Sequence, residues 1–205
     1  MASSLLVSYL PANYFLAVDL KSSDTALMTT KATRTTDAAK PAGKDPVDAI
    51  TAQWAEVRPD LDTAPMAVFG RVYRVARAMG DRIEKAYDRF GIARGEFDVL
   101  ATLRRSGEPY TLSPRQLSAT LMLTTGGMTG RLDKLERAGL LSRSPDPHDR
   151  RGLRVTLSER GLAIVDEAVV AGLEIQHEAL EGLREDQVEQ LQELLRLLLA
   201  GSTRD

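Results

Sequence analysis

Apolar residues recur at every third or fourth position over much of the chain, which is the spacing that places them on one face of an α-helix. Asp45-Pro46 is typical of an N-cap followed by a first helical residue, and the helix that it opens ends before Pro59. Two further helices are predicted over residues 65–90 and 94–105. The third helix is expected to turn Phe97, Leu100 and Leu103 inward. The apolar stripes of the first two are Val47, Ile50, Trp54 and Val57, and Met66, Phe69, Val72, Tyr73, Ala76, Met79, Ile83, Tyr87 and Phe90.

Two short helices and a hairpin follow along the chain. Ser113-Pro114 begins the first helix, and Thr124 or Thr125 begins the second, which runs to Arg137. Strands are predicted at residues 140–143 and 153–157, and the nine polar and charged residues between them are expected to form the hairpin tip. This order predicts a mainly α fold with a winged helix-turn-helix from about Ser113 to Leu157, in which the second helix is the recognition helix.

The last part of the chain is helical and acidic. Ser158 is predicted to cap a long helix that ends near Leu183, and a final helix carries apolar residues from Val188 to Leu198. Residues 161–205 hold ten acids and three bases, so this part is not expected to bind a polyanion. Its apolar stripe indicates packing against other helices, within one chain or between two chains.

Four segments are expected. Residues 1–44 are predicted to be a disordered tail, because residues 22–44 are polar and poor in apolar side chains. Met28 offers a second start, so residues 1–27 are a candidate for a mis-called start. The folded segments are the N-terminal helices at 45–93, the winged helix-turn-helix at 94–158 and the C-terminal helices at 159–205.

Composition excludes several classes of protein. The chain has no cysteine, which excludes disulfides, zinc-thiolate sites and thiol-based redox sensing. No apolar run reaches the roughly 20 residues that span a bilayer, and the apolar stretch Leu5–Val18 lacks the basic start of a signal peptide. A cytoplasmic protein that does not bind membranes is therefore expected.

Charge is concentrated in the predicted winged helix. The whole chain has a net charge of −2, yet residues 113–160 hold nine Lys and Arg against five Asp and Glu. A basic segment inside an acidic protein is typical of a local contact with a polyanion. A basic surface that only faces solvent is the alternative.

The recognition helix has an unusual composition. Gly126, Gly127 and Gly130 each cost about 1 kcal/mol of helix stability relative to alanine, which indicates a backbone that approaches another surface closely. Close packing against another helix of the same chain is the alternative explanation. Around them, the hydroxyls of Thr124, Thr125 and Thr129 and the charges of Arg131 and Lys134 suit phosphate and base contacts.

The hairpin tip carries a second candidate DNA contact. Arg151 suits a narrow minor groove, and Asp149 is placed to orient its guanidinium, whereas an exposed turn with a surface ion pair is the alternative. The complete predicted set of DNA-binding residues is Ser113, Arg115, Thr124, Thr125, Gly126, Gly127, Thr129, Arg131, Lys134, Asp149, Arg150 and Arg151.

Several of these motifs together resemble the MarR family. They are residues 121–129 (LMLTTGGMT), residues 135–141 (LERAGLL), Asp149-Arg150-Arg151 and Thr156-Leu157-Ser158, and the match covers about residues 60–200. The resemblance implies an obligate homodimer built from the N- and C-terminal helices. It also implies two winged lobes on a pseudo-palindromic operator in duplex DNA, and repression that a small effector relieves.

The added N-terminal helix resembles the urate-responsive (PecS-like) subgroup of that family. The effector set that this resemblance implies is Trp54, Asp98, Arg131 and Arg143. Trp54 would offer a flat apolar wall, and the two arginines would offer guanidinium partners to an aromatic anion. Another aromatic acid, such as a phenolic carboxylate, is the alternative effector. For the residues themselves, helix packing by Trp54, local pairing of Asp98 and phosphate contacts by the arginines are the alternatives.

An enzyme is not expected. His148 and His177 have no nucleophile or metal-ligand partner at a suitable spacing, and neither a catalytic site, a metal site nor a cofactor is predicted. A winged helix that binds proteins instead of DNA is the competing class, and the arginines of the wing and recognition helix count against it.

Overall fold

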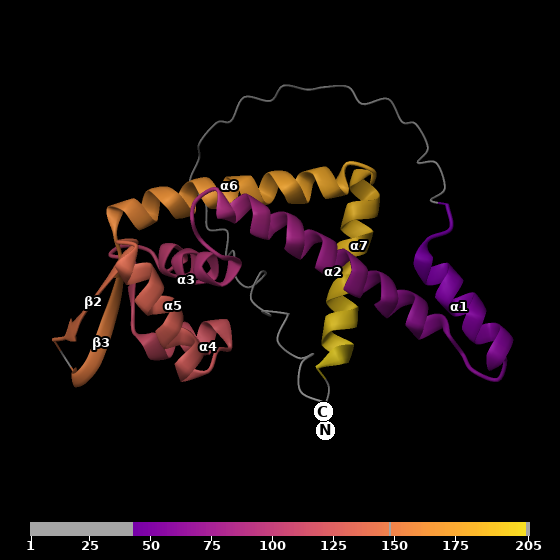
Figure 1. The fold of residues 1–205 in the computed structure, drawn as a ribbon, viewed down its shortest axis with the longest axis horizontal. Coiled ribbons are helices and arrows are strands. Elements are labelled where there is room, and N and C mark those ends of the chain that lie inside the picture. The colour runs from indigo at the N-terminus through magenta and orange to yellow at the C-terminus, as the bar shows by residue number, and fades with distance from the viewer. Residues whose placement is uncertain (1–42, 148, 204–205) are drawn as a thin grey trace. The chain divides into compact units, whose positions relative to one another are not determined.

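The computed structural model describes residues 43–147 and 149–203, without the side chains of Thr125, Arg150 and Arg151. Apart from Gly43 and Lys44, the tail predicted for residues 1–44 lies outside the described residues. Two compact units are present: the described residues from Glu84 to Gly172 form one, and residues 43–83 with 173–203 form the other. Helices α2 (Ala64–Asp88) and α6 (Glu159–Leu180) each continue from one unit into the other (Figure 1).

The first unit contains the winged helix-turn-helix. Three helices, α3 to α5, precede the hairpin of β2 and β3 (Figure 1). A short strand β1 completes an antiparallel sheet with the order β1-β3-β2. The elements are α3 (Arg94–Arg105), β1 (Thr111–Leu112), α4 (Pro114–Leu121), α5 (Thr125–Arg137), β2 (Leu141–Asp146) and β3 (Asp149–Leu157). The predicted mainly α fold with a winged helix is therefore confirmed.

The apolar stripes read from the sequence form the core of this lobe. Each helix and the sheet contribute side chains that are at most 2 % exposed, among them Leu100, Leu103, Leu117, Met128, Leu135 and Val155. Tyr87 from α2 stacks on Phe97 of α3, with ring centroids 4.4 Å apart. Burying each such side chain stabilises the fold by about 1.5–3 kcal/mol before the loss of conformational entropy.

The hairpin differs from the prediction. The expected nine-residue tip is wrong, because the ladder continues to Asp146 on β2 and Asp149 on β3 and leaves only residues 147 and 148 between the strands. Backbone pairing extends a ladder even where exposed side chains are polar, and a register shift at Pro145/Asp146 accommodates the proline. Strand β1 was not predicted, since two residues are too short to show an alternating pattern.

Local capping explains where several helices begin. Asp45 caps α1 (Pro46–Val57), and its carboxylate accepts from the backbone N–H groups of Val47 and Asp48. Ser113 caps α4 in the same way, and Ser158 accepts from the backbone N–H of Gly161 at the start of α6. These three N-caps are confirmed, whereas α6 ends at Leu180, three residues before the predicted position.

The second unit combines α1, most of α2, the end of α6 and α7 (Glu185–Ser202). Arg71 on α2 forms ion pairs with Asp45 and Asp48, which fasten the start of α1 to α2. None of the residues of α7 is buried. Large apolar side chains stay exposed on α1, α2 and α7, among them Ile50, Trp54, Phe69, Tyr73, Leu194, Leu195 and Leu197. No helix in the described part of the chain is long and apolar enough to cross a membrane.

Candidate nucleic-acid interface

Helix α5 has one buried face and one face in solvent. Met128, Leu132 and Leu135 are at most 2 % exposed and fix the helix to the core of the lobe. The opposite face exposes the three glycines together with Thr124 and Thr129. Thr124 is the N-cap, and its hydroxyl accepts from the backbone N–H of Gly127 at 3.3 Å. The outward face is therefore one of hydroxyls and bare backbone.

Packing within the chain does not require glycine on this face. A Cβ atom built on Gly126 or Gly130 meets no atom within 4 Å among the described residues, and one on Gly127 meets only the hydroxyl oxygen of Thr124, at 3.4 Å. Three residues that weaken the helix are thus retained where larger side chains would fit. The alternative of close helix packing does not explain them within the described lobe.

Helix α4, the first helix of the helix-turn-helix, presents a second exposed group. Arg115 lies in the first turn of α4, is exposed, and forms no ion pair in the described part of the chain. Ser113 precedes it as the N-cap, and its hydroxyl accepts from the backbone N–H of Gln116 at 3.2 Å. Helix α4 ends at Leu121, and its C-cap Met122 is an exposed residue in the left-handed conformation with φ of 48°. Arg115 is therefore available to an external anion.

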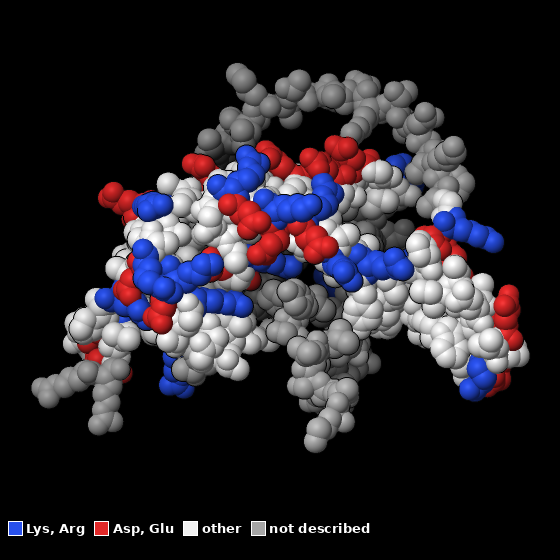
Figure 2. Space-filling view, viewed as in Figure 1, with Lys and Arg blue, Asp and Glu red and all other residues white. Residues whose placement is uncertain are grey.

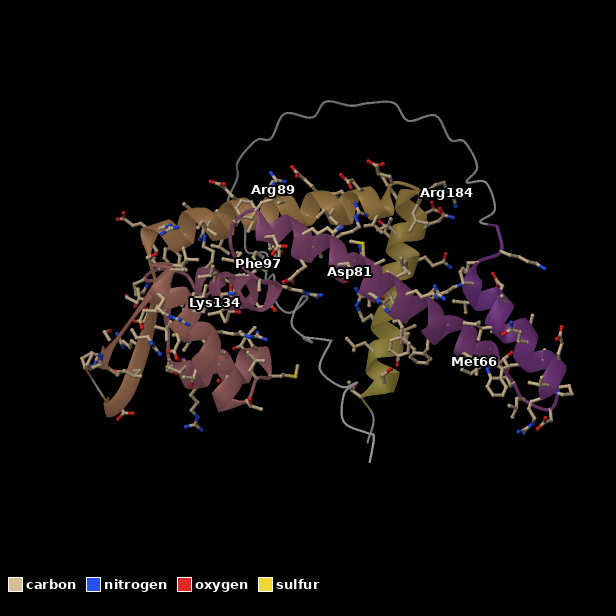
Figure 3. The ribbon with its side chains drawn as sticks, viewed as in Figure 1. Met66, Asp81, Arg89, Phe97, Lys134 and Arg184 are labelled. Atoms are coloured by element: carbon tan, nitrogen blue, oxygen red, sulfur yellow. The ribbon has the colours of Figure 1, made fainter. Side chains whose placement is uncertain are left out.

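The two cations of α5 that were predicted to contact DNA both have partners on α3, although the side chain of Lys134 is 59 % exposed. Lys134 lies on α5 (Figure 3). Its ammonium is 2.6 Å from a carboxylate oxygen of Glu96 on α3. A guanidinium N–H of Arg131 donates to the backbone carbonyl of Gly95, at 3.1 Å. A Cβ on Gly95 would lie 2.6 Å from the guanidinium carbon of Arg131, so this glycine makes room for the arginine.

Arg143 on β2 joins the wing to α5. Its guanidinium forms ion pairs with Asp133 and Glu136, both on the recognition helix. Hydrogen bonds from Arg143, first from its side chain and then from its backbone, lower the pKa of Glu136. Basic and acidic groups are correspondingly interspersed on the face drawn in Figure 2. The charge of Arg143 is thus already balanced within the lobe.

Asp98 on α3 is a half-buried carboxylate with an unsatisfied oxygen. Burial raises the pKa of Asp98, and the nearby charges of Arg94, Arg131 and Arg105 oppose that rise only in part. Its buried Oδ2 atom has no hydrogen-bond partner among the described residues. Of the four predicted effector residues, Arg131 is near enough for its charge to act on Asp98, and Arg143 pairs with acids of α5. Trp54 lies on α1 in the other unit and is 40 % exposed.

The wing tip carries acids close to a glycine. Asp149 is exposed at the start of β3, and Arg154 contacts Asp146 at 3.4 Å. A Cβ on Gly152 would lie 3.0 Å from the Cβ of Asp149, so the tip is closely packed at this point. The predicted contacts through the side chains of Thr125, Arg150 and Arg151, like His148, fall outside the described part of the chain. Across the described residues, no cluster of His, Asp and Glu could hold a metal ion.

Comparison with known proteins places this lobe in a family. A model of the MarR family matches residues 90–152, which run from just after α2 into β3. The HTH-type transcriptional regulator PecS of Dickeya dadantii is 38 % identical over 149 residues, which cover 73 % of this chain and 90 % of PecS. The chain belongs to the MarR family. The multiple antibiotic resistance protein MarR of Escherichia coli is 30 % identical and aligns over 63 % of this chain and 90 % of its own length.

The MarR fold is found in solved structures as well. A mutant of E. coli MarR complexed with operator DNA matches with a TM-score of 0.58 and 25 % identity, over 71 % of this chain and 97 % of that one. These relatives are transcriptional regulators, so the expectation of a regulator and not an enzyme is confirmed. The resemblance to the MarR family that the motifs carry is confirmed too.

The sequence did not indicate every residue that shapes this MarR-type lobe. Glu96 was not selected, although it is charged and only 6 % exposed. Gly95 and Arg94 were also not selected, because a glycine and an arginine in the first turn of a helix have no distinctive pattern. The one signal in the sequence that could have identified this contact is that Gly95 lies within a helix. A glycine there costs helix stability and therefore indicates a close neighbour.

Proposed function

We propose that this MarR-family chain is a homodimeric repressor that binds a pseudo-palindromic operator and is released by a small aromatic anion such as urate. In each protomer, the exposed face of α5 enters the major groove and the β2–β3 wing approaches the neighbouring minor groove. Arg115 and the hydroxyls of Ser113, Thr124 and Thr129 contact phosphates and fix the register of the protein on the duplex.

The observation that carries the DNA-binding part is the open space around the glycines of α5. Among the described residues, nothing lies within 4 Å of a methyl group added at Gly126 or Gly130, yet each glycine costs up to about 1 kcal/mol of helix stability. An external surface that must come close to the backbone explains both facts. The edge of a duplex groove is such a surface, and the neighbouring hydroxyls suit its polar groups.

Alanine variants at these glycines test the proposal. Gly126→Ala and Gly130→Ala should raise the melting temperature or leave it unchanged, and each should weaken binding to the DNA upstream of the protein's own gene by about tenfold or more. Gly182→Ala is the matched control, because a Cβ there also meets nothing within 4 Å and the residue lies outside the winged helix. Fluorescence anisotropy of labelled DNA gives the affinities. Unchanged affinity in both α5 variants would argue against close approach by this face.

A salt titration separates DNA binding from protein binding. The logarithm of the affinity for duplex DNA should fall linearly with the logarithm of the salt concentration, because each neutralised phosphate releases counterions. A flat response would favour a winged helix that binds proteins.

The proposed pseudo-palindromic operator implies that the protein binds it as a homodimer. Two identical lobes on one duplex read half-sites about one helical turn apart, so the operator mirrors the two-fold symmetry of the protein. The exposed apolar side chains of α1, α2 and α7 support this assembly, since such side chains gather at subunit interfaces. Sedimentation equilibrium at micromolar concentration tests it, and a monomer that binds DNA with a single half-site would contradict it.

The effector proposal is supported by Asp98 and Arg131. The buried Oδ2 of Asp98 has no hydrogen-bond partner among the described residues, and the charge of Arg131 on the recognition helix acts on this carboxylate, so an anion that binds near Asp98 would compete for Arg131 and shift α5. Trp54, which the resemblance to the PecS-like subgroup adds to the effector set, is 40 % exposed on α1 and is suited by its flat ring to an aromatic ligand.

Trp54 is also the chain's one tryptophan, so its fluorescence reports a single site. Urate should change the emission and release DNA, and Asp98→Asn should keep DNA binding while blunting the release. If a phenolic carboxylate changes the emission and releases DNA while millimolar urate does neither, the effector is the phenolic carboxylate and not urate. A normal urate response in Asp98→Asn would remove Asp98 from the switch.

A further inference from the structure

Glu96 is a buried carboxylate in the first turn of α3, and it has two separate partners. One oxygen accepts from the backbone N–H of Ala93 at 2.9 Å, which caps the helix. The other oxygen lies 2.6 Å from the ammonium of Lys134 on α5. The side chain of Glu96 is 7 % exposed, and an unpaired charge at that depth would be costly. Lys134 is therefore the counter-ion on which the buried Glu96 depends.

A second polar contact joins the same two helices. Arg131 lies one turn before Lys134 on α5, and it donates to the backbone carbonyl of Gly95, the residue next to Glu96. Two turns of the recognition helix are thus fixed to one turn of α3. The buried apolar face of α5 holds the helix in place but is not directional, whereas an ion pair and a hydrogen bond restrict its rotation about its own axis.

We propose that Lys134 and Glu96 are positioning residues, whose ion pair sets the orientation in which α5 presents its exposed face to the operator. The inference rests on the proposed DNA-binding function and assigns Lys134 a role different from a phosphate contact. Lys134 acts through Glu96 and does not need to touch the nucleic acid. Moving the ammonium to a phosphate would leave the buried Glu96 without its counter-ion.

The two roles for Lys134 differ in their salt dependence. A lysine that neutralises a phosphate contributes about one unit to the slope of log affinity against log salt. A lysine that orients α5 through Glu96 contributes affinity and leaves the slope unchanged, because the number of phosphate contacts stays the same. The roles also differ in coupling, since only a positioning role makes the effect of Lys134 depend on Glu96.

The test is a double-mutant cycle in the full-length protein with Lys134→Met, Glu96→Gln and the double variant. Methionine keeps most of the aliphatic stem, and glutamine keeps an oxygen for the N–H of Ala93. We expect Lys134→Met to weaken binding to the upstream DNA about fivefold with an unchanged salt slope, and to have less than about a twofold effect when Glu96→Gln is present. Lys134→Arg should restore most of the affinity, because a guanidinium also pairs with a carboxylate.

Lys85→Met is the matched control, because Lys85 is exposed on α2 and forms no ion pair among the described residues. An equal loss from Lys134→Met in both backgrounds, with a slope smaller by about one, would identify a phosphate contact and overturn the inference. Urea unfolding of the same four proteins measures the coupling without DNA, and no coupling there would also overturn it. Failure of the wild-type protein to bind DNA at any salt concentration, with that coupling present, would instead reject the proposed function and with it the positioning role.

Discussion

Arg143 holds the carboxylate of Glu136 through its backbone N–H and its guanidinium, so the first strand of the wing and the recognition helix share one acid. The backbone N–H and the Nε–H of Arg143 each donate at 2.9 Å, one to either oxygen of Glu136. Asp133 adds an ion pair to the same guanidinium at 2.7 Å. The wing and α5 are therefore joined by polar contacts on the side of α5 that faces β2, while Lys134 and Arg131 join α5 to α3.

Glu136→Gln should lower stability in a pH-dependent way. Hydrogen bonds from Arg143 lower the pKa of Glu136 in the folded state, so its contribution is present above the unfolded pKa of about 4.3 and is lost as pH falls through the folded value. Urea unfolding should show the variant less stable than wild type at pH 7, with the difference closing in acid. Glu189→Gln, which changes an exposed carboxylate outside any ion pair in the described chain, is the control variant. A deficit that persists unchanged in acid would mean that the charge of Glu136 is not what matters.

Asp98→Asn should change stability in the opposite direction to Glu136→Gln. Burial raises the pKa of Asp98, so the ionised form is the one that folding disfavours. Its penalty is absent below the ordinary aspartate pKa of about 3.9 and grows as pH rises through the raised folded value. The variant should be more stable than wild type at pH 7, and the gain should vanish in acid.

Asp186→Asn provides the comparison for that experiment. A hydrogen bond from Arg184 lowers the pKa of Asp186, so this variant should lose stability above the unfolded pKa. Lower stability of Asp98→Asn at neutral pH would show that attraction to Arg94, Arg131 and Arg105 outweighs burial.

The sequence predicted those parts of the fold that local chemistry determines. Asp45, Ser113 and Ser158 were identified as N-caps because a capping side chain acts within three residues of its own position. The wing tip was predicted too long, since pairing between strands is a property of the backbone and continues through polar residues. Periodicity shows which face of a helix is buried, and it predicted the core of the lobe for the same reason.

The partners of the charged residues were not predictable in the same way. Lys134 and Arg131 lie on α5 at positions typical of a DNA contact, and their partners Glu96 and Gly95 lie far earlier in the chain. A long flexible side chain reaches several groups from one backbone position, so only the tertiary arrangement of α3 and α5 determines which one it meets. Hydrophobic spacing along the chain therefore predicts the architecture, whereas the partners of the charged side chains depend on tertiary contacts between distant segments.

Gly161→Ala should be strongly destabilising. Gly161 is buried in the first turn of α6, and a Cβ there would lie 1.9 Å from the backbone oxygen of Leu140. The same carbonyl accepts from the N–H of Ser158, so the start of α6 cannot move away without losing that hydrogen bond. Overpacking of this kind costs about 1–3 kcal/mol, which urea unfolding would measure. Gly201→Ala, in open space on α7, is the control, and wild-type stability in Gly161→Ala would mean that the α6 start relaxes freely.

Arg151→Ala should weaken operator binding and leave the fold intact. Arg151 lies in β3 next to the short turn of the wing, the part of the lobe proposed to approach the minor groove, where the negative potential of a narrow groove attracts a guanidinium. Binding to the upstream DNA should fall about tenfold, with a smaller salt slope if the guanidinium also neutralises a phosphate. Arg184→Ala removes the same charge from the N-cap of α7 and controls for net charge. Equal affinities for wild type and Arg151→Ala, at matched melting temperature, would reject the role of the wing tip in the minor groove.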